Sequence, residues 1–159
     1  MIDLLNKLTN IIKNKRNMNP EEKRQHLEFI QNIITRMNTN SFQIKGMAVT
    51  IVSALIAIYA GTSNPLFVFL GIIPTFLFWF LDSYYLQQER KFRGVYNNVS
   101  GLKSDVEIKP YEMPIQKFKG GQYRYCNVLF SKTILWLYLS IILFLVIIGS
   151  VLECNSFAS

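Results

Sequence analysis

Three apolar runs, at residues 46–61, 66–86 and 133–152, separate the polar parts of the chain. A helix crosses the hydrocarbon core of a bilayer with about 20 predominantly apolar residues, so each run has close to the length of one crossing. The whole chain is 50% hydrophobic, which is close to the share in soluble proteins. The segregation of apolar residues into these runs therefore predicts three membrane spans.

Positive charge is confined to one side of the predicted spans. Eight of the 17 Lys and Arg residues lie in 1–45 and nine in 90–132, whereas the link 61–65 and the tail after Lys132 contain none. The positive-inside rule then predicts a bacterial inner-membrane protein with a cytoplasmic N-terminus and a periplasmic C-terminus. We divide the chain into cytoplasmic helices (1–44), a transmembrane hairpin of spans one and two (45–86), a cytoplasmic extension with a basic hairpin (87–132), a third transmembrane helix (133–152) and a periplasmic tail (153–159).

A long helix is predicted to run from the cytoplasmic part into span one. Asn19-Pro20-Glu21-Glu22 is typical of a helix N-terminus, with a capping Asn, a proline at the first position and acids in the first turn. We expect one continuous helix from Pro20 to about Ala60, or a break near 38–40, where poor helix formers gather. Positions that alternate by three and four predict a coiled-coil seam that could serve oligomerisation and that is polar only at Ser41; these are Leu27, Ile30, Ile34, Met37, Ser41 and Ile44.

Residues 2–12 also show helical periodicity, which predicts a short amphipathic helix on the membrane surface or against another helix. Within span one, small residues recur at intervals of three and four. Such a stripe allows close helix packing in lipid, or its hydroxyls could face a water-filled pore. The stripe consists of Gly46, Thr50, Ser53 and Ala57, of which Thr50 and Ser53 are the candidate pore residues.

Span two carries three further predictions. Pro74 removes a backbone donor and should kink the helix. Asp82 and Lys45 lie at similar distances from the turn centre near Ser63, so an ion pair between them is expected at one depth. The pair could set the register of the two helices or act as a gate. The helix should continue to about Ser100, end at Gly101 and pack against the 20–44 helix.

The segment between spans two and three changes character. Pro110 and Pro114 exclude a helix through that stretch, and Gly120-Gly121 between two alternating runs predicts a β-hairpin. The fold class is therefore an all-α membrane protein with three transmembrane helices, helical cytoplasmic extensions and a small cytoplasmic β-hairpin segment. Cations and aromatic rings alternate in the hairpin and could hold phosphates and bases, or lipid headgroups; the candidate ligand-binding residues are Lys117, Phe118, Lys119, Tyr123, Arg124 and Tyr125.

Composition narrows the chemistry. The formal net charge is +7, which attracts anionic lipid, nucleic acid or nucleotides. Cys126 and Cys154 fall on opposite sides of the membrane and have no metal-binding spacing around them. His26 is the only histidine, and no Gly-rich phosphate loop or nucleophile motif accompanies it. We therefore expect neither an enzyme nor a metal site.

Two segments carry a resemblance to a known family, LEFIQNIITRMNTNSFQIKG at 27–46 and FWFLDSYYLQQER at 78–90. Over roughly residues 20–100 the chain resembles small bacterial membrane proteins encoded beside nucleotidyltransferases, the membrane effectors of Hailong anti-phage defence (the Hailong protein A family). The resemblance implies an oligomeric ion channel with a cytoplasmic crown. It also implies that short DNA made by the partner enzyme holds the channel closed, and that losing the DNA opens it and arrests growth.

Together these features predict a ligand-gated homo-oligomeric channel, with a tetramer as the working expectation. Its regulatory ligand would be single-stranded oligodeoxyadenylate made by a partner nucleotidyltransferase. Lys45, Thr50, Ser53 and Asp82 are the expected pore and gate residues. Two alternatives stay open: a non-conducting membrane scaffold that recruits a cytoplasmic partner through the 20–44 seam, and a holin-like pore without ligand control.

Overall fold

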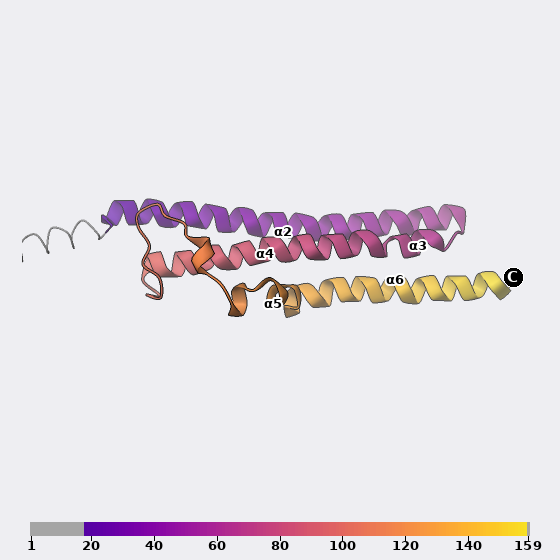
Figure 1. The fold of residues 1–159 in the computed structure, drawn as a ribbon. Helices are drawn as coiled ribbons and strands as arrows, with labels where there is room; N and C mark the ends of the chain where they lie inside the picture. Colours follow the sequence, from indigo (N-terminus) through magenta and orange to yellow (C-terminus); the bar gives the residue numbers. More distant parts are fainter. Residues whose placement is uncertain (1–17, 159) are drawn as a thin grey trace, which may run out of the picture.

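Three long helices lie side by side in the computed structural model, which describes residues 18–158 and the side chains of 18–154. They are α2 (Pro20–Thr62), α4 (Ile72–Ser100), which the short α3 (Leu66–Leu70) precedes, and α6 (Lys132–Ala158). Helix α4 packs against both α2 and α6 and is the middle helix of the three (Figure 1). Each of the three rods is long and apolar enough to cross a membrane, as the apolar runs predicted. The predicted helix at 2–12 lies outside the described residues.

Helix α2 is continuous, so the break considered near 38–40 is not found. It begins where the sequence predicted, and the carboxylate of Glu22 accepts the backbone N–H of Asn19 at 3.1 Å. With 43 residues the helix is about 65 Å long, roughly twice the hydrocarbon thickness of a bilayer. Ile34, Ser41 and Ile44 are buried on either side of the polar stretch. Their packing against α4 outweighs the weak helix propensity of the Asn and Thr residues between them.

The predicted seam of α2 packs within the chain. Ile30 and Ile34 of α2 form one buried cluster with Val95 and Val99 of α4. This confirms that the extension of span two packs against the 20–44 helix. Because this face is covered by the same chain, it is not free to bind a second copy, and the expectation of a seam for oligomerisation is wrong for this face.

The second span is interrupted at Gly71, between α3 and α4. Pro74 lies three residues later and explains the position of the break, because a proline ring clashes with the carbonyl four residues earlier, that of Leu70. The Gly71 carbonyl accepts both the Thr75 hydroxyl, at 2.7 Å, and the Thr75 backbone N–H, at 3.4 Å, so the helix resumes directly after the break. At the other end Gly101 has φ of 90° and closes α4, as the sequence predicted.

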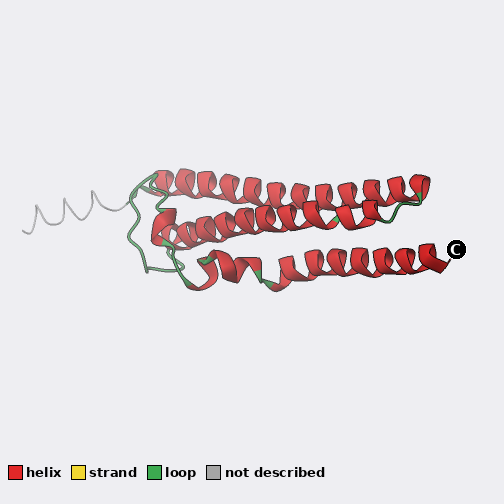
Figure 2. Cartoon of the chain, turned by 45° about the vertical axis from the view of Figure 1, so that its right-hand side comes forward, coloured by secondary structure: helices red, strands yellow, loops and turns green. Residues whose placement is uncertain are grey.

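The predicted β-hairpin is wrong. The described residues contain no strand, and the segment forms two 3-10 turns (Ile115–Lys117 and Gly121–Tyr123) followed by α5 (Tyr125–Leu129) (Figure 2). Burial of aromatic side chains accounts for the difference. Phe118 and Tyr123 meet edge to face with ring centres 5.5 Å apart. Both rings dock on Gly94 of α4, and this contact with a helix replaces strand pairing in the segment.

Gly94 provides the seat for this aromatic pair on α4. A Cβ atom at Gly94 would lie 2.6 Å from the Phe118 ring and 2.9 Å from the Tyr123 hydroxyl. Those separations are too short for real contacts, so only glycine lets the loop approach this closely. The Gln87 amide donates to the Tyr123 carbonyl at 2.8 Å and fixes the same turn. Helix α4 thus positions residues 115–124 at one end of the bundle.

Most of the apolar surface in the three spans faces outward. Of the most apolar 18-residue stretch of α2, only 17% is buried. The corresponding share is 33% for the second span and 22% for α6. In a bilayer such surface meets lipid tails or neighbouring subunits. We call the opposite, polar part of the bundle, residues 20–44 with 87–131, the basic end.

Candidate functional site

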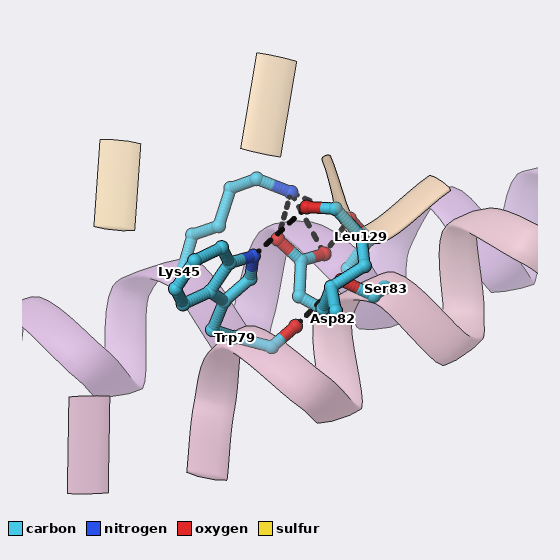
Figure 3. Close-up of polar contacts among 6 residues, drawn as sticks. Lys45, Trp79, Asp82, Ser83 and Leu129 are labelled. Atoms are coloured by element: carbon cyan, nitrogen blue, oxygen red, sulfur yellow. Dashed lines mark hydrogen bonds and ion pairs between the residues drawn. The ribbon is translucent and has the colours of Figure 1, made fainter. Parts of the chain in front are cut away.

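A buried polar layer joins α2 and α4 where the apolar and basic parts of the bundle meet (Figure 3). Asp82 is fully buried, and the Lys45 ammonium lies 2.9 Å from its Oδ1 and 2.8 Å from its Oδ2. The Ser41 hydroxyl donates to the same Oδ1, and Lys45 donates to that hydroxyl oxygen at 2.6 Å. The ion pair that the sequence predicted is therefore formed, within a three-residue network.

The geometry of this layer explains why a charge is tolerated there. A carboxylate removed from water is costly unless a cation and hydrogen-bond donors surround it. Lys45 supplies the cation from α2, and Ser41, one turn earlier on the same face, supplies a second donor. The sequence marked Ser41 only as the lone polar member of the seam. A polar residue in a seam that packs against the helix of Asp82 was the sequence signal for this hydrogen bond.

Helix α6 reaches the same layer through aromatic side chains. Trp79 stacks on Tyr138 with ring centres 6.3 Å apart and planes 9° apart, and its indole N–H donates to the Leu129 carbonyl at 3.1 Å. The buried Tyr138 hydroxyl lies within electrostatic reach of Asp82. All three helices are therefore connected at this depth. No local sequence pattern marks Trp79 and Tyr138 for this role, because the residues that they connect are far apart in the chain.

The outward face of α2 carries a second feature, a stripe of small and polar side chains. Ala48 and Val52 are buried inside the bundle, whereas Thr50 and Ser53 are exposed. The Thr50 hydroxyl donates back to the Gly46 carbonyl at 2.9 Å. The stripe runs along the whole helix at intervals of three and four, all of it exposed. This outer stripe consists of Glu21, Gln25, Glu28, Asn32, Thr35, Thr39, Gln43, Gly46, Thr50, Ser53, Ala57 and Gly61.

The six predicted ligand-binding residues do not form one surface. Phe118 is buried in the cluster against α4 and is not accessible to a stacking base. Tyr123 packs beside it, and the Tyr125 hydroxyl donates to the Phe80 carbonyl at 2.9 Å. The Lys117 ammonium lies 3.9 Å from the Glu112 carboxylate.

The remaining cations of the basic end are available for an anionic ligand. Several are exposed and form no ion pair among the described residues. The group consists of Arg36, Lys103, Lys109, Lys119 and Arg124. A pocket of about 220 Å³ between α2 and α4, which the sequence did not reveal, adds a phenol ring, two amides and the Arg93 guanidinium, which pairs with the Glu89 carboxylate at 2.7 Å. Such groups bind phosphates and base edges; the pocket is lined by Gln31, Ile34, Arg93, Tyr96 and Asn97.

His26 is a buried polar group at the basic end. Its ring is 6.0 Å from that of Tyr111, and neither ring nitrogen has a hydrogen-bond partner among the described residues. Burial lowers the pKa of His26, and the nearby backbone of Glu112 opposes this shift. The neutral imidazole is therefore the form that suits the packed loop.

The part of the chain that the structure describes holds no cluster of three His, Cys, Asp or Glu residues suited to a metal ion. Comparison with protein-family models, with curated proteins and with solved structures finds no match to this chain. The family resemblance therefore remains a prediction.

The buried pair should dominate the stability of the bundle. Replacing Lys45 by Met leaves the Asp82 carboxylate buried without its cation and should cost roughly 3–5 kcal/mol. The double variant Lys45→Met with Asp82→Asn removes the unpaired charge and should recover more than half of the loss. Thermal unfolding in detergent measures both, with the exposed Lys119→Met as a control that should change little. A double variant no more stable than Lys45→Met would contradict the argument.

His26 should make the basic end sensitive to acid. Its folded pKa lies below the ordinary value of 6.5, so the unfolded chain binds the proton first as the pH falls. Stability should therefore be constant above pH 6.5 and decrease below it, down to the folded pKa. The His26→Leu variant should lose this step in the unfolding midpoint. Equal pH profiles for the variant and the wild type would count against the assignment.

Proposed function

We propose that the protein is a ligand-gated, homo-oligomeric ion channel that acts as the membrane effector of an anti-phage defence system. The outer stripe of α2 is the observation that supports this proposal best. A helix advances about 100° per residue, so positions spaced by three and four share one face. Ala48 and Val52, which contact the rest of the chain, lie on roughly the opposite side. Most of the stripe therefore faces away from its own bundle, and Ser53 at its edge lines a pocket with Ser140 and Phe144 of α6.

Hydroxyls and small residues on an outward face of a membrane span gain little from lipid. Turned towards an axis shared by several copies, they would instead leave room for water between the helices. The stripe continues beyond the apolar part of α2, where it consists of Gln, Asn, Thr and Glu side chains. A ring of α2 helices would thus form a polar passage through the membrane and the basic end.

The orientation follows from charge. The positive-inside rule places the basic end in the cytoplasm and the end of α6 in the periplasm of a bacterial inner membrane. The cytoplasmic crown would then consist of the α2 and α4 extensions and the loop between α4 and α6.

The ligand is proposed to be short single-stranded DNA, an oligodeoxyadenylate made by a partner nucleotidyltransferase. The exposed cations of the basic end and the pocket at Arg93 and Tyr96 supply suitable groups for phosphates and bases. The identity of the ligand and its closing action rest on the family resemblance. Loss of the DNA would open the pore and arrest growth.

The Ser41–Lys45–Asp82 layer is the proposed link between ligand and pore. Ligand contacts at the basic end would bias how α2 sits on α4, and this layer is the polar joint between the two helices. A non-conducting scaffold is less well supported. Its proposed docking surface, the 20–44 seam, is covered by α4.

Cysteine modification tests the pore. In a Cys126→Ser, Cys154→Ser background, single cysteines at Thr50, Ser53 and Ala57 should react with a charged thiol reagent in the open channel. The current should fall by roughly half or more, because the added group occupies the lumen. Ile51→Cys and Ile58→Cys are matched controls, exposed on the same helix but off the stripe. Equal effects at both sets of positions would refute the pore assignment.

A binding titration tests the ligand. Purified protein should bind a short oligodeoxyadenylate with an affinity that falls steeply with salt, because phosphate contacts release counterions. The double variant Lys119→Glu, Arg124→Glu should weaken binding about ten-fold or more and flatten the salt dependence. Lys132→Glu, next to the third span, should have a smaller effect. Affinity that is indifferent to salt would rule out a nucleic-acid ligand of this kind.

A further inference from the structure

One large apolar side chain stands beside the outer stripe in its polar half. Phe42 is 76% exposed, the highest value among the exposed large hydrophobic residues. It lies on the same side of α2 as Gly46, about 40° away around the helix. Its neighbours one turn away on that side, Asn38, Thr39 and Gly46, are polar or small, and the exposed Val49 follows two turns on. The structure records no aromatic partner for it among the described residues.

The depth of Phe42 is as informative as its exposure. Ser41 precedes it and Lys45 follows within one turn, and both bind the buried Asp82. Phe42 thus lies at the junction between the apolar spans and the basic end, at the level of the polar layer. The aromatic residues that suit a lipid interface are instead on α4 and α6, where Tyr84 and Trp136 are exposed.

We infer that Phe42 side chains from neighbouring copies meet at the axis and form the hydrophobic gate of the channel. This inference rests on the proposed function. A ring of phenyl groups in an otherwise polar passage excludes water and ions when narrow, without any direct plug. The occupant of the exposed Phe42 face is therefore the same residue of other copies.

The same geometry couples the gate to the basic end. Ser41 and Phe42 are adjacent, so their side chains point about 100° apart, one to Asp82 and the other to the axis. A rotation of α2 that withdraws Phe42 from the axis must also move Ser41 and Lys45 relative to Asp82. The polar layer thus holds α2 in the rotation that keeps the Phe42 gate closed. Ligand contacts on α2 or α4 can favour or oppose that rotation.

Bilayer recording of the purified full-length protein tests the gate. With oligodeoxyadenylate present, Phe42→Ala should raise the open probability about ten-fold or more over wild type, because small side chains leave a hydrated gap. Phe42→Leu should remain closed, since it keeps an apolar constriction. Phe80→Ala removes an exposed ring near the same depth on α4 and should behave as wild type.

A second measurement covers the case in which Phe42→Ala does not assemble. In the background without native cysteines, Phe42→Cys, whose side chain is also small, should conduct with oligodeoxyadenylate present, and a charged thiol reagent should change that current. Ile51→Cys should show no change in the closed state.

The outcomes separate two failures. The first failure concerns the gate alone. Nuclease-treated wild type conducts, but with oligodeoxyadenylate present Phe42→Ala, or the modified Phe42→Cys, is as silent as wild type. The gate is then refuted and the channel stands. If Phe80→Ala leaks as much as Phe42→Ala, the leak reflects general disruption and the gate is also refuted. If no variant and no treatment produces current, the proposed function itself is wrong.

Discussion

The burial of one carboxylate constrains the whole bundle. Asp82 is removed from solvent in the middle helix and is held by Lys45 and Ser41 of α2. A charge in such a place fixes the register of its partners, because sliding either helix by one turn would strand it without a cation. Apolar contacts along α2 and α4 lack this directionality. The polar layer therefore specifies how the two helices meet, and the apolar clusters on either side add stability.

That constraint also decides which faces remain free. Once Ser41 and Lys45 point at Asp82, the seam of α2 is turned onto α4 and the outer stripe is turned away. In the proposed oligomer, association with other copies would use the stripe and the apolar flanks beside it. Helix association in lipid depends on close packing and polar contacts and not on burial of apolar area. A face of Gly, Ala, Ser and Thr suits that requirement or the lining of a hydrated lumen.

The sequence predicted the helices well because their signals are local. Asn19-Pro20 and Gly101 marked the ends, and equal distances from the turn predicted the Lys45–Asp82 pair. It failed for 115–129, where alternation and Gly120-Gly121 suggested strands. The deciding contact there joins Phe118 to Gly94 across 24 positions of chain, and no local pattern records it. For the same reason the pocket at Arg93 and Tyr96 was not foreseen.

A polar joint made of an ion pair would also suit the movement that the proposed gating requires. Apolar packing loses contacts gradually, whereas a Lys–Asp pair in low dielectric has one favourable geometry and a steep cost when parted. Lys45 keeps 27% of its side chain exposed, whereas the Asp82 side chain is fully buried. An anion near Lys45 would compete with Asp82 for the same charge. In the proposed channel this joint would take two distinct states, and a ligand on the basic end would bias them.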